Sequence, residues 1–353
     1  MKLIIQIPCF NEEATLPATI ADLPREVEGI ETVEWLVIDD GSTDRTVEVA
    51  REHGVDHIVR LTNNKGLAAG FQAGLDASLK LGADVIVNTD ADNQYFGGDI
   101  PKLVAPILAR NADMVIGNRQ TDTIEHFSPL KKRLQQLGSA VVRRASGTDV
   151  PDTTSGFRAY NREAALQMQV VSKFTYTLES IIQAGKMVVA VEDVPIRTNE
   201  QTRESRLFPS MWAYVRRNTV SIFRIYTLYE PLRVFLFAAA VTALVGAVIW
   251  LRFLYFFFFA DEPGQHIQSL ILGSTLFIVA VQFVALGVIG DILAGMRVIQ
   301  QRVLERVRRV ELHLGVEPSH YEPGAKDTGQ APTTGADAGR ATGKTEDREA
   351  VKL

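Results

Sequence analysis

Two carboxylates stand directly after a short apolar run and could bind one divalent cation together. The run covers residues 85–88, and Asp90 and Asp92 follow it one residue apart. Alternate residues of an extended chain share a face, so the two carboxylates would point the same way. Carboxylate oxygens are hard ligands of the kind that divalent cations prefer. Asp and Asn are also turn residues, so the stretch taken alone fits an ordinary polar turn equally well.

Polar residues follow not one but four of the expected strands. Short apolar strands are predicted at 2–7, 35–38, 57–59, 85–88 and 114–117, with helical stretches between them. This alternation is typical of a mostly parallel sheet covered on both faces, whose carboxyl ends meet at one ligand-binding edge. The four clusters are Asn11 and Glu12, Asp39 and Asp40, Asp90 and Asp92, and Asn118 and Arg119. Together they favour one shared site over separate polar loops.

Other sites and classes of protein are disfavoured by composition and missing motifs. No Gly-x-Gly-x-x-Gly follows the first strand and no Walker lysine is present, so dinucleotide and P-loop sites lack their residues. The net charge of −5 over 353 residues gives no reason to expect a nucleic-acid partner. Cys9 is the single cysteine, which fits a reducing compartment. The N-terminal run of residues 3–7 is too short for a signal peptide.

Two long uncharged stretches near the C-terminal end indicate membrane spans. Residues 234–251 and 267–290 carry no charge, and each is long enough to cross a hydrocarbon core of about 30 Å. The loop between them, 261–266, has no Lys or Arg, whereas both flanks are rich in arginine. The positive-inside rule therefore predicts a multi-pass protein of the cytoplasmic membrane, with the N-terminal half and both termini in the cytosol.

These features divide the chain into five parts. We expect an α/β domain over 1–210, a basic amphipathic juxtamembrane segment over 211–231 and two membrane helices within 232–296, at about 232–259 and 267–293. A separate cytosolic amphipathic helix is expected on the inner leaflet over 297–316, and a disordered tail over 317–353. Within the first part, residues 152–158 are expected to lead into an edge strand or a turn. The basic run 131–133 fits either a solvated helix face or a surface for phosphate or anionic lipid.

Several of these segments together resemble the family 2 glycosyltransferases with the GT-A fold. The segments that carry the resemblance are 7–13 (Ile-Pro-Cys-Phe-Asn-Glu-Glu), 37–44, 63–66, 89–94 and 155–158 (Ser-Gly-Phe-Arg), and it covers about residues 1–210. The two spans narrow it to the polyprenyl-phosphate hexose synthases, such as dolichyl-phosphate mannose synthase and the undecaprenyl-phosphate glucosyltransferases. The implied fold is α/β, a GT-A nucleotide-diphosphosugar transferase domain with a mostly parallel sheet, followed by two transmembrane helices.

The resemblance implies a role for particular residues. Asp90, Asp92 and Gln94 would hold Mg²⁺ or Mn²⁺ against the donor diphosphate. The donor nucleotide would contact Pro8, Phe10, Glu12, Asp39, Asp40 and Asp90. Arg119 and Arg133 would face the lipid phosphate, Asp152 would lie near the reacting anomeric carbon, and Arg203 and Arg206 would belong to a loop that closes over the diphosphate. The sequence departs from the family at Asn93, where Leu is common, and at 203–206, where Gly-Glu-Ser-Lys is common.

The implied activity is inverting transfer of a hexose from a UDP- or GDP-sugar to polyprenyl phosphate, undecaprenyl or dolichyl, at the cytoplasmic face of the membrane. A family 2 transferase with another lipid or a saccharide acceptor is the alternative within enzymes. A non-catalytic membrane scaffold that keeps the fold is the alternative from another class. Some relatives tetramerise through their membrane segments, so a homo-oligomer is possible, but the sequence does not test it.

Overall fold

The computed structural model describes residues 1–120, 142–143, 146–170, 176–199, 220, 223–224, 226–259 and 266–325. Its strands are β1 (Lys2–Cys9), β2 (Thr32–Asp39), β3 (His57–Arg60), β4 (Val85–Asn88), β5 (Met114–Asn118), β6 (Arg158–Asn161), β7 (Val191–Pro195) and β8 (Tyr321–Pro323). Its helices are α1 (Leu16–Asp22), α2 (Thr46–Glu52), α3 (Leu67–Lys80), the 3₁₀ turn η1 (Gly97–Asp99), α4 (Ile100–Leu108), α6 (Arg162–Gln167), α7 (Thr177–Lys186), α9 (Pro231–Phe259) and α10 (Ile267–His313).

One eight-stranded sheet, in the order β7-β5-β6-β4-β1-β2-β3-β8, forms the centre of the α/β domain. Strands β1, β2, β3 and β4 pair in parallel, as predicted. Leu3, Ile5 and Ile7 of β1 pack in one apolar cluster and Ile4 in another, so the sheet is buried on both faces. Alternation of side chains along a strand explains this division.

Strand β6 corrects one expectation. Residues after 152 were expected to lead into an edge strand or a turn, yet β6 lies inside the sheet, antiparallel to both β4 and β5. Arg158 pairs in register with Asn88 and Ile116, so the antiparallel strand begins at the edge where its neighbours end. The short segment contains too little periodic pattern to indicate two partners, because strand pairing is set by tertiary contacts.

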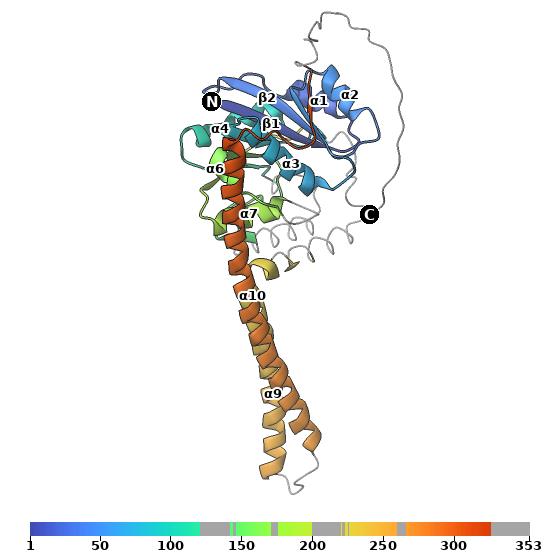
Figure 1. Ribbon diagram of the computed structural model, residues 1–353. Coiled ribbons are helices and arrows are strands. Elements are labelled where there is room, and N and C mark those ends of the chain that lie inside the picture. Colours follow the sequence, from blue (N-terminus) through green and yellow to red (C-terminus); the bar gives the residue numbers. More distant parts are fainter. Residues whose placement is uncertain are drawn as a thin grey trace, which may run out of the picture.

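The helices α9 and α10 form a long hairpin that projects from the α/β domain (Figure 1). They have 29 and 47 residues, and both are long and apolar enough to cross a membrane. The two helices approach closely at Gly246 and Gly273, where a Cβ added to Gly273 would lie 2.1 Å from Trp250. Large apolar side chains such as Phe237 and Ile271 remain exposed along the hairpin. An exposed apolar surface of this length is what a pair of lipid-facing helices presents.

A second correction concerns the segment after the second apolar stretch. The predicted separate helix over 297–316 is instead the continuation of α10, which ends at His313. This part lies along the α/β domain rather than on a leaflet: Lys80 forms an ion pair with Glu311, and Arg309 with Glu163. Buried Arg308 donates to the carbonyl oxygens of Leu166 and Met168 at 2.9 and 2.8 Å. The prediction of a helix here is confirmed, but polar side chains make these contacts with the α/β domain, while Val303, Val307 and Val310 remain exposed.

The tail predicted to be disordered from residue 317 begins with an ordered segment. Strand β8 adds antiparallel to β3 and forms the edge of the sheet. The amide of Arg60 donates to the carbonyl of His320 at 2.9 Å, and Ala325 donates to Val55 at 2.9 Å. An edge strand offers unpaired backbone groups to any extended segment that reaches it, whatever the segment's side chains. Composition alone therefore missed the pairing. Residues 326–353 lie outside the described residues, as does most of the juxtamembrane segment 211–231.

Removing the guanidinium of Arg308 should loosen α10 from the α/β domain. Arg308→Ala leaves two carbonyl oxygens at the end of α6 without their donor, which costs about 2 kcal/mol. The expected drop in Tm of the detergent-solubilised protein is about 4 °C, measured by thermal unfolding. Arg306→Ala, which removes an exposed arginine from the same helix, is the control and should leave the Tm unchanged. Equal melting of both variants would contradict the docking role of Arg308.

Candidate active site

The loop after β4 carries the first two predicted ligands and is fitted closely to the segment before β6. A Cβ added to Gly156 would lie 3.0 Å from Oδ2 of Asp90 and 2.6 Å from the hydroxyl of Tyr176, so only glycine fits there. The amide of Gly156 donates to the hydroxyl of Tyr95 at 2.9 Å. Asn88, at the end of β4, donates to the carbonyl of Gly156 at 2.9 Å. These contacts fix the position at which Asp90 leaves the sheet.

Asp90 and Asp92 lie close enough to repel each other. Burial, and then the charge of Asp92, raises the pKa of Asp90, while the charges of Arg119 and Arg158 lower it. Glu12, from the loop after β1, adds to the negative potential at Asp90. Asp92 Oδ1 accepts a hydrogen bond from the Gln94 amide at 3.2 Å. The predicted convergence of the first, fourth and fifth strand-end loops is thus visible in the charges that act on one carboxyl group.

The donor set fits a divalent cation that also binds a substrate. The described residues contain no group of three or more His, Cys, Asp or Glu side chains arranged to hold a metal. Asp90 and Asp92 are therefore an incomplete set. Mg²⁺ commonly binds through one or two carboxylates and completes its shell with substrate phosphates and water. Two mutually repelling carboxylates on one loop match that pattern, with Gln94 on the same loop.

Asp39 and Asp40, at the end of β2, bind backbone groups of neighbouring loops. Asp40 accepts from the amides of Lys65 and Gly66 at 2.7 and 2.8 Å. Burial raises the pKa of Asp40, although these two bonds oppose the shift. Oδ1 of the fully buried Asp39 accepts from the amide of Ser42 at 3.0 Å, and its Oδ2 lies 3.6 Å from Nε of Arg60. Both carboxylates thus hold the backbone of the loops that follow β2 and β3.

The loop after β1 is interlocked with the loop after β2. Asn11 adopts a left-handed conformation with φ of 55°, and its amide donates to the hydroxyl of Ser42 at 2.9 Å. The Asn11 side-chain oxygen accepts from the amide of Thr43 at 2.8 Å. Glu12 accepts from the hydroxyl of Thr15 at 2.6 Å. Pro8 is buried within the sheet, while the Phe10 side chain is exposed. Asn11 belongs to the first predicted strand-end cluster, and Asn is a residue type that tolerates a left-handed backbone.

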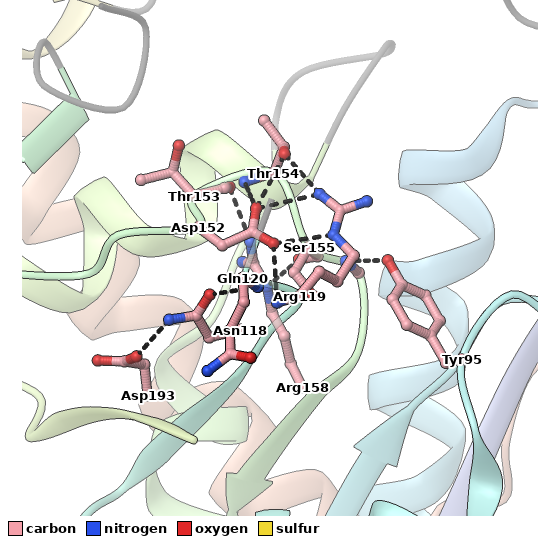
Figure 2. A network of polar contacts seen from close by, with 11 residues as sticks. Tyr95, Asn118, Arg119, Gln120, Asp152, Thr153, Thr154, Ser155, Arg158 and Asp193 are labelled. Carbon is pink, nitrogen blue, oxygen red and sulfur yellow. Dashed lines mark hydrogen bonds and ion pairs between the residues drawn. The ribbon is translucent and has the colours of Figure 1, made fainter. Parts of the chain in front are cut away.

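Arg119 and Asp152 form a paired group rather than two independent site residues (Figure 2). Arg119 Nε donates to Asp152 Oδ2 at 2.8 Å, and its Nη2 donates to Asp152 Oδ1 at 3.0 Å and to the hydroxyl of Thr154 at 2.7 Å. Asp152 is 2% exposed. Although burial opposes it, the Arg119 guanidinium lowers the pKa of Asp152. An ionised carboxylate with both oxygens engaged is a weak proton acceptor.

Arg158 ties the Asp152 loop to α7. Its side chain is fully buried, and it donates to the carbonyl oxygens of Ser155 at 2.7 Å, Thr177 at 2.8 Å and Thr153 at 3.1 Å. A guanidinium has five donors in a fixed plane, which suits it to bind several carbonyl groups at once. The motif 155–158 was read as a family marker, and the structure adds that its arginine holds the loop in place. The remaining predicted residues, Arg133, Arg203 and Arg206, lie outside the described residues.

Comparison with known proteins agrees with this arrangement. Residues 4–168 match the family model described as glycosyl transferase family 2. The chain is 30% identical to the UDP-N-acetylglucosamine–dolichyl-phosphate N-acetylglucosaminyltransferase of Methanococcus voltae, over 56% of this chain and 86% of that protein. It is 27% identical to the undecaprenyl-phosphate mannosyltransferase of Micrococcus luteus, over 56% of this chain and 83% of that protein.

One solved structure agrees on the fold. Glucosyl-3-phosphoglycerate synthase from Mycobacterium tuberculosis, in complex with phosphoglyceric acid, aligns with a TM-score of 0.50 at 20% identity, over 64% of this chain and 79% of that one. The mostly parallel sheet, the carboxylates after β4 and the sequence matches all lead to one assignment. The chain is a glycosyltransferase and belongs to glycosyl transferase family 2.

Proposed function

We propose that the protein transfers a hexose from a nucleotide-diphosphate sugar to a polyprenyl phosphate at the cytoplasmic face of a membrane. The observation that carries the proposal is the continuity of α10, which leaves the apolar hairpin and docks directly on the α/β domain. From Gly290, the end of the uncharged run, to Arg308 the helix rises about 27 Å at 1.5 Å per residue. The α/β domain is thus held about 27 Å from the end of the uncharged run. A domain kept this near a membrane suits an acceptor whose phosphate lies at the membrane surface.

Relatives support the acceptor class. Two proteins at about 30% identity are named for transfer to dolichyl phosphate and undecaprenyl phosphate, and their sugars differ. We therefore propose a polyprenyl phosphate as acceptor and leave the hexose to experiment. The arginine-rich flanks of the hairpin favour the α/β domain and both termini in the cytosol, with loop 261–266 on the other side. Proteolysis within 261–266 from the cytosolic side of sealed vesicles would contradict this orientation.

The donor would bind across the strand-end loops. Pro8, Phe10, Glu12, Asp39 and Asp40 are proposed to line the nucleotide pocket, and Asp90, Asp92 and Gln94 to hold Mg²⁺ or Mn²⁺ at the diphosphate. A bound cation would supply charge stabilisation as the nucleotide diphosphate leaves. Arg203 and Arg206 are proposed to close over the same diphosphate, on the strength of the family resemblance.

The acceptor would bind at Arg119, with Arg133 as its proposed second cation. A phosphate monoester is largely ionised at neutral pH and is already a nucleophile, so the reaction needs little help from a general base. This agrees with the geometry of Asp152, whose oxygens bind Arg119 and Thr154. Arg119 would hold the phosphate for in-line attack on the anomeric carbon, and Asp152 would hold Arg119. A single displacement inverts the anomeric centre, so an α-linked donor gives a β-linked product.

A donor and acceptor panel tests the proposal. Full-length protein in detergent is incubated with Mn²⁺ and one of UDP-glucose, UDP-galactose, UDP-N-acetylglucosamine or GDP-mannose, each with a short-chain polyprenyl phosphate, diacylglycerol or ceramide. We expect one donor to give a polyprenyl-phosphate sugar, detected by mass spectrometry, with a β linkage by NMR. Transfer only to diacylglycerol or ceramide would replace the acceptor class. Absence of turnover with every pair would favour a non-catalytic subunit.

A further inference from the structure

The segment Ile196–Asn199, here called the strap, joins the loop of Asp90 and Asp92 to the neighbourhood of Arg119. At its start, the amide of Ile196 donates to the carbonyl of Asn118 at 3.0 Å. At its end, the amide of Asn199 donates to the carbonyl of Gln94 at 2.9 Å, and Thr198 bridges antiparallel to Tyr95. The strap therefore contacts both halves of the proposed active site.

The side chain of Asn199 binds Asn93, which lies between two of the three proposed ligands, Asp92 and Gln94. Its Nδ2 donates to the carbonyl oxygen of Asn93 at 3.1 Å and contacts the Asn93 side-chain oxygen at 3.3 Å. Asn93 has a φ of 56°, a left-handed conformation that Asn adopts more readily than most residues but that still costs some free energy, so hydrogen bonds from neighbours help to hold it. Because Asn93 stands between Asp92 and Gln94, its backbone conformation sets the direction in which both side chains point.

The strap has a second anchor that does not depend on Asn199. Arg197 donates through its amide to Asp99 Oδ2 at 2.7 Å and through Nη2 to Asp99 Oδ1 at 2.7 Å. Its guanidinium also lies 4.0 Å from the centre of the Phe96 ring. Despite burial, the bonds from Arg197 lower the pKa of Asp99 to about 2, so this anchor stays charged at neutral pH. Loss of the Asn199 side chain should therefore free the conformation of Asn93 while the strap stays in place.

We infer that Asn199 is a positioning residue for the cation site, acting through Asn93 to set the geometry of Asp92 and Gln94. The inference rests on the proposed function, because it needs a cation at this loop. Residues that do not touch a metal but orient its ligands through hydrogen bonds are often important for binding. Removing such a residue commonly weakens metal affinity about 10-fold or more. Asn199 fits that description through its two contacts with Asn93, and it does not itself need to touch the donor or the acceptor.

The test measures Mn²⁺ binding directly. Full-length protein in detergent is titrated with Mn²⁺ in the presence of UDP and, separately, GDP, and free Mn²⁺ is read by electron paramagnetic resonance. Asn199→Ala is expected to weaken Mn²⁺ binding about 10-fold with the nucleotide that supports binding. Asn199→Ser, which keeps a shorter donor, should lose about threefold by the same reasoning. Thr198→Ala is the matched control on the strap, since the Thr198 side chain is exposed, and it should bind Mn²⁺ as the unaltered protein does.

The outcomes separate the two proposals. If the unaltered protein binds no Mn²⁺ with either nucleotide, the cation site of the proposed function is wrong. If it binds Mn²⁺ and both Asn199 variants bind equally well, the inference about Asn199 is wrong and the cation site stands. Thermal unfolding of each variant shows whether the strap still folds. Weakened binding by Asn199→Ser at an unchanged Tm supports positioning even where Asn199→Ala melts early.

Discussion

Asp152→Asn is expected to reduce the turnover number about 100-fold and to lower the free energy of unfolding by about 3 kcal/mol. The substitution keeps the shape of the side chain but removes the charge that faces Arg119. Asp152 is 2% exposed and the Arg119 side chain 21% exposed, so little water replaces the lost partner. Breaking one side of a buried pair leaves an uncompensated charge, which explains why stability and activity should fall together. Steady-state kinetics and thermal unfolding measure the two effects.

A double-mutant cycle distinguishes the two roles open to Asp152. If Asp152 acts by holding Arg119, adding Arg119→Lys to Asp152→Asn should cost little more activity than the worse single variant. Lysine cannot form the bidentate contact that arginine makes with a carboxylate, so Arg119→Lys already breaks the contact with Asp152. If Asp152 acts on the substrate by itself, the two losses should multiply, and the holding role would be wrong. Asp193→Asn alters another acceptor in the same network, bonded to Asn118 at 2.9 Å, and should change activity less than about threefold, because the amide oxygen of Asn can still accept that bond.

The positions of the strand-end residues could be predicted because they depend on local pattern. A short apolar run followed by Asp39, Asp90 or Arg119 places each residue at a strand end, and the rule for parallel sheets then brings the ends together. Contacts between the loops after β1, β2 and β3 agree with this for the part of the chain that the structure describes, because the Asn11 amide donates to Ser42 and the Lys65 amide to Asp40. Placing these residues at the strand ends therefore required no knowledge of tertiary contacts.

The contacts within the site could not be predicted in the same way. Asp152 stands 33 residues after Arg119. Nothing in either segment indicates that the Arg119 guanidinium donates to both carboxylate oxygens of Asp152. The same holds for β6, which enters the sheet between β4 and β5, and for Asn199, which binds Asn93 from 106 residues away. These features depend on which surfaces meet after folding, and sequence pattern describes only each surface by itself.

The two errors at the C-terminal end have a related cause. An amphipathic helix rich in arginine suits a leaflet or a protein surface equally, and Arg308 decides the matter by binding carbonyl oxygens at the end of α6. A polar tail with few large apolar residues can still add a strand, because the backbone supplies the hydrogen bonds. Composition predicts burial of side chains well and backbone pairing poorly.

Asp92→Asn is expected to reduce Mn²⁺-dependent transfer at least 100-fold while leaving the Tm of the cation-free protein unchanged or slightly raised. Asp92 repels Asp90 when no cation lies between them, so replacing one carboxylate with an amide relieves that repulsion. The same change removes one of the two proposed carboxylate ligands and should with it remove most of the attraction for a divalent cation. Loss of activity at undiminished stability is therefore the signature that separates this substitution from Asp152→Asn, which should lower both.

The contrast between the two variants is the strongest check on the division of the site. Asp90 and Asp92 repel each other and are proposed to share a cation, whereas Asp152 forms an ion pair with Arg119. Mn²⁺ titration followed by electron paramagnetic resonance should show a much larger loss of binding in Asp92→Asn than in Asp152→Asn. Glu48→Gln removes the same charge from an exposed position on α2 and should match the unaltered protein. Full activity of Asp92→Asn at the same Mn²⁺ concentration would remove this carboxylate from the cation site.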